Sequence, residues 1–227
     1  MPSTISDFHT HTFLSDGSMS PFELARRAIV NRYGVLAITD HVGPANLEHI
    51  VQTLARDCTL INESLNIRAI SGVEITHVPS KLIDETARKA KELGAQIVVV
   101  HGETITEPVE PGTNLAALRS RHVDILAHPG LLTRREAEMA AEAGIFLELS
   151  SKRGHSLTNG HVARLALEAG ASLVLDSDTH EPNDLLTDET AHRVVQGSGL
   201  QMDQIAVVLK HNPTALLKRL FPNQVGV

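Results

Sequence analysis

The chain has 227 residues, of which 42% are hydrophobic, and its formal net charge is −7. This length and apolar content predict one globular domain over residues 1–227 with a sizeable core. The negative charge argues against a partner such as long nucleic acid, whose binding proteins are usually basic. The only cysteine is Cys58, which excludes an internal disulfide bond.

The apolar residues are spread over short runs. No run approaches the roughly 18 residues that a membrane-spanning helix requires. The opening residues MPSTISDF lack the charged, apolar and small-residue regions of a signal peptide. We therefore expect a cytoplasmic protein that has no membrane partner.

Short apolar runs alternate with amphipathic stretches along the chain. The apolar runs predict buried strands at residues 4–9, 35–41, 67–74, 96–102, 123–129, 145–151 and 172–180. The stretches between them predict helices that include residues 20–34, 81–94, 133–144 and 159–170. This alternation predicts parallel strands with crossover helices, in either a β/α barrel or an open doubly wound sheet. The glycine motifs of nucleotide-binding sheets are absent.

Capping residues support these helix boundaries. Ser20 followed by Pro21 predicts the start of one helix, and Thr133 with Glu136 forms the pattern of a capping box. Glycines stand just before the next strand, where helix C-caps belong, at positions 34, 94, 144 and 170.

Polar side chains gather at the predicted strand ends. In the stretch DFHTHTFLSDG, His9 and His11 are two residues apart, and their side chains would face the same side of a strand. Six of the seven predicted strands end in His, Asp or Glu, although the strands themselves are apolar. In parallel β/α folds the carboxyl ends of the strands collect the active site. Burying several unpaired ionisable groups together is costly, and bound cations remove that cost.

The strand-end residues therefore predict a metal centre. Their nitrogen and oxygen ligands suit Zn, Mn or Fe, and they are numerous enough for two or three divalent ions. The candidate ligands are His9, His11, Asp16, His41, Glu74, His101, His128, Asp178 and His180.

The motifs DFHTHTFLSDG, AITDH, GVE, VVVHG, ILAHP and DSDTH, in this order over residues 7 to about 180, resemble those of the PHP (polymerase and histidinol phosphatase) family. The resemblance implies a distorted seven-stranded (β/α)7 TIM-like barrel with a trinuclear metal centre that hydrolyses phosphate esters. It also implies three ligand sets: His9, His11, Glu74 and Asp178 for one ion; Glu74, His101 and His128 for a second; and Asp16, His41 and His180 for a third.

Residues after the sixth and seventh strands are candidates for substrate binding and catalysis. Lys152 and Arg153 would either bind phosphate or belong to a solvated basic loop, and Arg153 and His180 are the candidate catalytic residues. His155 could orient a leaving group, but we expect it to be exposed. Asp40 could accept a hydrogen bond from a ligand imidazole or serve as a turn residue, and His77 could reach the site from its loop.

These features predict a PHP-type phosphatase. A metal-bridged hydroxide would attack a small phosphorylated substrate, most simply a phosphate monoester. One alternative is a phosphodiesterase that acts on nucleotides or short oligonucleotides. A second is a metal-dependent amidohydrolase, although the lysine that such sites usually carry after a middle strand is absent. A third is a metal-stabilised binding module without catalysis.

Overall fold

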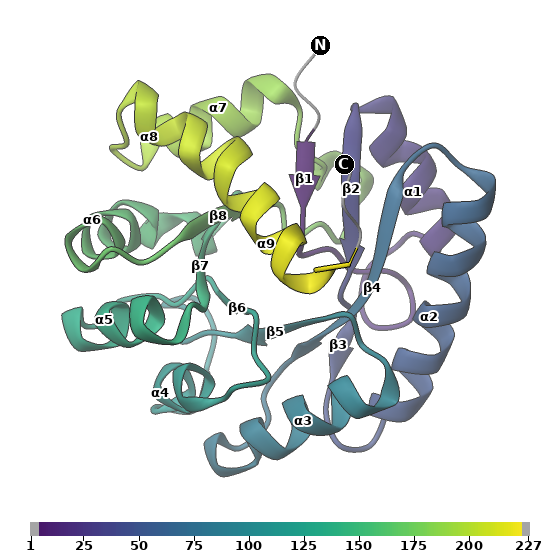
Figure 1. Ribbon diagram of the computed structural model, residues 1–227, viewed down its shortest axis with the longest axis horizontal. Helices are drawn as coiled ribbons and strands as arrows, with labels where there is room; N and C mark the ends of the chain where they lie inside the picture. The colour runs from purple at the N-terminus through teal and green to yellow at the C-terminus, as the bar shows by residue number, and fades with distance from the viewer. Residues whose placement is uncertain (1–4, 224–227) are drawn as a thin grey trace.

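A computed structural model describes residues 5–223 and contains the predicted seven-stranded β/α barrel (Figure 1). The parallel strands, in hydrogen-bonded order, are β1 (Ile5–Asp7), β2 (Tyr33–Ile38), β4 (Arg68–Ile75), β5 (Ile97–His101), β6 (Ile125–Ala127), β7 (Phe146–Ser150) and β8 (Leu173–Asp176). A two-residue strand, β3 (His41–Val42), also pairs with β4. The barrel, rather than the open doubly wound sheet, is therefore the fold.

Backbone hydrogen bonds beyond the ends of β1 and β8 bring the two outer strands together. The His11 N–H donates to the Thr179 carbonyl at 2.8 Å, and the Asp178 N–H donates to the His9 carbonyl at 2.9 Å. Thr10 and Thr179 form an isolated parallel bridge. The contacts that close the barrel thus also fix three of the predicted ligand residues.

The helices surround the strands as an outer layer, except for the last one, which lies across one end of the barrel (Figure 1). They are α1 (Pro21–Val30), α2 (Leu47–Ser64), α3 (Ile83–Leu93), α4 (Thr113–Arg119), α5 (Arg134–Ala143), α6 (Asn159–Ala169), α7 (Asp188–Gly197), α8 (Met202–Ala206) and α9 (Asn212–Leu220). Single 3₁₀ turns lie at Ser80–Leu82, His155–Thr158 and Pro182–Asp184, and a π-helical turn lies at Val207–His211. Between residues 5 and 223, no helix is both long and apolar enough to cross a membrane.

The predicted helix caps are confirmed with one exception. The Ser20 hydroxyl accepts a hydrogen bond from the Glu23 N–H, and Thr133 forms its capping box with Glu136. The C-caps of α3, α5 and α6 are left-handed glycines at positions 94, 144 and 170. The expectation for Gly34 was wrong. Helix α1 already ends at Val30, and Arg32 turns the chain with a φ of 66°, so position 34 lies inside β2.

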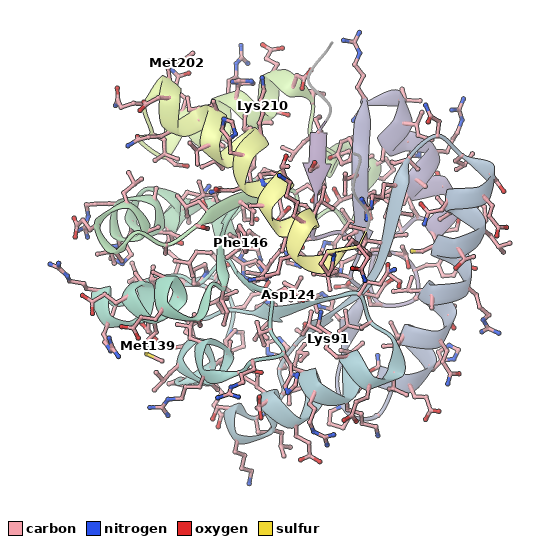
Figure 2. The ribbon with its side chains drawn as sticks, in the orientation of Figure 1. Lys91, Asp124, Met139, Phe146, Met202 and Lys210 are labelled. Atoms are coloured by element: carbon pink, nitrogen blue, oxygen red, sulfur yellow. The ribbon has the colours of Figure 1, made fainter. Side chains whose placement is uncertain are left out.

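Helix α9 covers the amino-terminal end of the barrel (Figure 1). Its Leu216 side chain is fully buried and belongs to the apolar cluster inside the barrel, which also contains Phe146. The Arg219 guanidinium lies 5.1 Å from the centre of the Phe146 ring and forms a 3.1 Å ion pair with Asp124, just before β6. Figure 2 labels Phe146 and Asp124. The opposite, carboxyl-terminal end of the barrel holds the predicted site.

Candidate metal centre

An open pocket of about 490 Å³ lies at the carboxyl ends of the strands. Strand ends and the loops that follow them form its walls. The predicted ligands lie at these strand ends and in these loops. The lining includes Asp16, His41, Thr76, His77, His101, Glu107, His128, Lys152, His155, Asp178 and His180.

The Glu74 carboxylate lies at the centre of the site and is fully buried. Its Oε1 atom is 3.3 Å from Nε2 of His9 and 3.6 Å from Nε2 of His128. Its Oε2 atom is 2.6 Å from Nδ1 of His41 and 3.7 Å from Nε2 of His11. One carboxylate therefore faces four imidazoles that come from three separate segments of the sequence.

Asp178 faces the same imidazoles from the β8 side. Its Oδ1 atom lies 3.2 Å from Nε2 of His11 and 3.9 Å from Nε2 of His9. Its backbone is left-handed, with a φ of 53°, and the φ of His128 is 26°. Non-glycine residues with such positive φ angles are strained. Strained residues are common at functional sites, where the surrounding structure holds them in place.

Asp16 and His180 form the outer part of the site. The Asp16 Oδ1 atom is 3.2 Å from Nε2 of His180 and 3.4 Å from Nε2 of His41. Gly17 allows this loop to lie against the strand end, because a Cβ atom there would come within 2.6 Å of the His11 carbonyl oxygen. The side chains of Asp16 and His180 are more exposed than those around Glu74.

All nine predicted ligands belong to at least one group of side chains whose donor atoms lie within 4.8 Å of one another. The groups are His9, Glu74 and His128; His9, His11 and Asp178; His11, Asp16, His41 and His180; and His101, His128 and His155. Their assignment as ligands of particular ions remains a prediction, which this proximity supports.

Several buried polar atoms of the cluster have no hydrogen-bond partner, including Nε2 of His9, Nε2 of His11 and Oε1 of Glu74. Buried polar atoms are nearly always paired, because an unpaired one costs free energy. Imidazole nitrogens and carboxylate oxygens are the donor atoms that divalent zinc and manganese accept. The cluster therefore fits metal ions in both its donor chemistry and its unsatisfied atoms.

The protonation of the imidazoles follows from burial and from the carboxylates. Burial alone would lower the pKa of His9, but Glu74 and Glu148 raise it well above its ordinary value. Burial, and then the neighbouring His41, lowers the pKa of His11 to about 3. Burial likewise lowers the pKa of His128 to about 4. Neutral imidazoles of this kind have a free lone pair for a cation.

Two carboxylates near the site were missed by the sequence analysis. Glu148 lies in the middle of β7, fully buried, with Oε2 2.7 Å from Nδ1 of His9. Glu107 lies on the loop after β5, with Oε2 2.9 Å from Nε2 of His101. The LELS pattern around Glu148 places a charged residue inside an apolar strand, and this was the signal that could have identified it.

The substrate candidates differ in position. Lys152 lines the pocket, and its Nζ atom lies 2.9 Å from Nδ1 of His180 and 3.3 Å from Oδ2 of Asp184. Arg153 is exposed and does not line the pocket, so its proposed roles in phosphate binding and catalysis remain predictions that no contact supports. His180 has Nε2 towards Asp16 and Nδ1 2.9 Å from the Asp178 carbonyl.

The positions of His155, Asp40 and His77 at the site differ from one another. The expectation that His155 is exposed was wrong: it is 6% exposed, because Thr104 and Thr106 cover it from a distant loop. Asp40 accepts hydrogen bonds from Thr12 and Ser15, so it anchors the first loop and no ligand imidazole is bonded to it. His77 is exposed and lines the pocket.

A family model described as PHP domain matches residues 7–141. An uncharacterized protein of Methanocaldococcus jannaschii is 48% identical over 94% of this chain and 99% of its own length. The DNA polymerase/3'-5' exonuclease PolX of Bacillus subtilis is 31% identical over 82% of this chain, which spans only 36% of PolX. A probable phosphatase of Shewanella loihica is 29% identical over 94% of this chain and 92% of that protein.

Solved structures show the same fold at low sequence identity. The putative histidinol phosphatase hisK from Listeria monocytogenes aligns with a TM-score of 0.57 and 12% identity over 79% of this chain and 97% of that chain. The ochratoxinase of A. niger aligns with a TM-score of 0.64 and 13% identity over 94% of this chain and 71% of that chain. At these identities the similarity concerns the fold alone.

Proposed function

Because this chain belongs to the PHP domain family, we propose that it is a metal-dependent phosphoesterase whose substrate is a small phosphate monoester. The observation that carries the proposal is that Lys152 lines the same pocket as six of the nine candidate ligands. An ammonium group beside a cluster of divalent cations suits a phosphoryl group, which carries several negatively charged oxygens. Similarity to a probable phosphatase along 94% of the chain supports the same reaction class.

The candidate ligands would hold metal ions at two depths of the pocket. The buried donor atoms around Glu74 and Asp178 would hold two ions, and Asp16, His41 and His180 would hold a third. Such ions, when bound, supply an activated water and neutralise charge on the phosphoryl oxygens. Zinc, manganese and iron all suit these ligands.

Lys152 would bind a phosphoryl oxygen at the outer edge of this cluster. Its ammonium group is held by Asp184 and by the Asp178 carbonyl, 3.1 Å away. This anchoring keeps the positive charge near the ligands, so that a phosphate monoester would contact the protein and the cations together. Both ring nitrogens of His180 are already engaged, and its assignment as a catalytic residue stays a prediction.

A substrate panel tests the proposal. We expect the protein loaded with Mn²⁺ or Zn²⁺ to hydrolyse p-nitrophenyl phosphate, and we expect a chelator to abolish turnover. The diester bis(p-nitrophenyl) phosphate and an amide panel measured in parallel separate the reaction classes. Hydrolysis of amides without phosphoester cleavage would favour an amidohydrolase, and no turnover by the metal-loaded protein would contradict catalysis.

A phosphodiesterase is the second candidate. It is favoured by the 31% identity to PolX, whose name includes a 3'-5' exonuclease, although this chain spans a minor part of that protein. The net charge of −7 and the single lysine in the pocket lining argue for a small substrate over a long polyanion. Faster turnover of the diester than of the monoester would favour this alternative.

A further inference from the structure

We propose that His155 is a metal ligand, and that it completes a three-imidazole site with His101 and His128. The inference rests on the proposed metal centre and adds to it a ligand from the loop after β7. It changes the composition of the second site, which the family resemblance builds from Glu74, His101 and His128 alone. The site would then bind one cation between the ends of three different strands.

The three imidazoles lie close together and are buried. One donor nitrogen from each lies within 4.8 Å of the other two. The rings of His155 and His128 are stacked, with centroids 4.1 Å apart and an interplanar angle of 19°, and the His155 and His101 centroids are 6.1 Å apart. All three are at most 6% exposed. A third imidazole at this position is thus inside the cluster, not at its rim.

The Nε2 atoms of His155 and His101 are directed at the same carboxylate. Both face the Glu107 carboxylate, at 3.5 Å from Oε1 and 2.9 Å from Oε2 respectively. The His155 Nε2 atom is also 3.5 Å from Oδ2 of Asp178, which the proposed centre already includes. Carboxylates therefore lie next to the lone pairs that a cation would share.

The other ring nitrogen of His155, Nδ1, is held by threonine hydroxyl groups. Its Nδ1 atom forms a 2.7 Å hydrogen bond with the Thr104 hydroxyl and lies 3.3 Å from the Thr106 hydroxyl. His9 has the same arrangement, with Nδ1 bonded to Glu148 and Nε2 towards the cluster. Metal-binding histidines generally engage their second nitrogen in this way, which fixes the tautomer and the direction of the ring.

The backbone of the loop holds this orientation. Gly154, just before His155, has a φ of 99°, a conformation that favours glycine. A Cβ atom at this position would lie 3.2 Å from Cγ2 of Thr106, so the loop fits closely against the threonines. The 3₁₀ turn that begins at His155 then leads directly into α6. Hydrogen bonds thus hold the ring of His155, and the close fit of the loop holds its backbone.

Cobalt binding tests the proposal without relying on activity. The full-length protein is stripped with a chelator and titrated with Co²⁺, whose visible absorption reports ligand number and geometry. The variants are His155→Gln, Thr104→Val and the control His77→Gln. His77 lines the same pocket, 5.4 Å from the His101 ring centroid, but belongs to none of the donor groups. Circular dichroism confirms that each variant is folded.

We expect His155→Gln to lose one cobalt equivalent, or to weaken that equivalent by more than 100-fold, with a changed visible spectrum. Thr104→Val should weaken the same equivalent roughly 10–100-fold, the usual effect of losing an outer hydrogen bond. His77→Gln should bind like the wild type. Unchanged cobalt affinity and spectrum in His155→Gln would overturn the proposal, and lost turnover alongside would assign the residue to the substrate. Normal cobalt binding by a wild type that hydrolyses no phosphoester would contradict only the proposed function.

Discussion

The Nδ1 atom of His9 lies 2.7 Å from Oε2 of Glu148, and neither side chain is exposed to solvent. The pair links the middle of β7 to the first candidate ligand of the chain. It leaves Nε2 of His9 directed at Glu74, 3.3 Å away. We infer that Glu148 acts through His9, as a positioning residue that would set the tautomer and ring direction of this candidate ligand.

Replacing Glu148 should weaken metal binding. We expect Glu148→Ala to lower the affinity for Mn²⁺ or Zn²⁺ by roughly 10–100-fold, as the loss of an outer partner of a ligand histidine usually does. Glu148→Gln keeps an oxygen acceptor and should retain more of the affinity. Calorimetric titration of the stripped protein measures both, and Glu63→Ala, on the exposed surface of α2, is the control. Equal affinity in Glu148→Ala and the control would exclude the positioning role.

Lys152 should contribute to substrate binding more than to metal binding, because Nδ1 of His180 keeps the Asp178 carbonyl as a partner when the lysine side chain is removed. We expect Lys152→Met to raise the KM for p-nitrophenyl phosphate by roughly 10–100-fold, because a charged hydrogen bond contributes about 1.5–3 kcal/mol. The metal content should stay at the wild-type value. Steady-state kinetics and elemental analysis measure the two effects, with Lys210→Met, an exposed lysine on the π-helical turn, as the control (Figure 2). A normal KM would place the phosphate elsewhere.

Helix α9, which covers the amino-terminal end of the barrel, should contribute to stability and have little effect on catalysis. Leu216 is fully buried inside the barrel, at the end opposite the pocket. Leu216→Ala should lower the free energy of unfolding by about 2–5 kcal/mol, since it removes buried methyl groups and leaves a cavity. Leu167→Ala, at a site on α6 that is 47% exposed, should cost much less. Urea unfolding gives both values, and a negligible loss for Leu216→Ala would mean that α9 is dispensable.

Asp176 should make stability depend on pH. Burial, and then the neighbouring Asp7, raises its pKa well above the ordinary value of 3.8, and its Oδ2 atom has no hydrogen-bond partner. The folded state therefore keeps a proton that the unfolded state has lost, so this contribution to stability is present at low pH. It disappears as the pH rises from 3.8 through the raised pKa of the folded state.

The variant Asp176→Asn removes that titration. We expect the free energy of unfolding of the variant, minus that of the wild type, to increase with pH over this range. The slope should be at most about 1.4 kcal/mol per pH unit for one proton. Denaturant unfolding in the presence of chelator, at a series of pH values, measures it without interference from metals. A difference that stays constant with pH would show that Asp176 is ionised in the folded protein.

Much of the fold was readable from the sequence because apolar runs and helix caps are local signals. The seven strands and the glycine C-caps of three helices were predicted from patterns among neighbouring residues. The gathering of His and carboxylate residues was also readable, because parallel strands align their carboxyl ends. Glu148 and His155 were harder to assign, since their partners His9 and Thr104 are 139 and 51 positions away. Such long-range contacts leave no periodic pattern in the sequence.

The position of Arg153 shows a related difficulty. The sequence places it beside Lys152 after β7, yet only the lysine turns into the pocket, while the arginine faces solvent. The direction of adjacent side chains on a loop depends on its backbone dihedral angles, which residue types alone do not determine. The covering of the barrel by α9 depends likewise on contacts of Leu216 and Arg219 with distant strands.

The number of metal ions that the protein binds shows whether the clustered imidazoles and carboxylates form a metal centre. The chain is purified, stripped with chelator, reloaded with Mn²⁺ or Zn²⁺ and freed of excess ion, and the bound metal is counted by inductively coupled plasma mass spectrometry. We expect two or three ions per chain, and a lower number in Glu74→Gln, because the Glu74 carboxylate faces both His9 and His128. Less than one ion per chain, or a count that the loss of Glu74 leaves unchanged, would contradict this expectation.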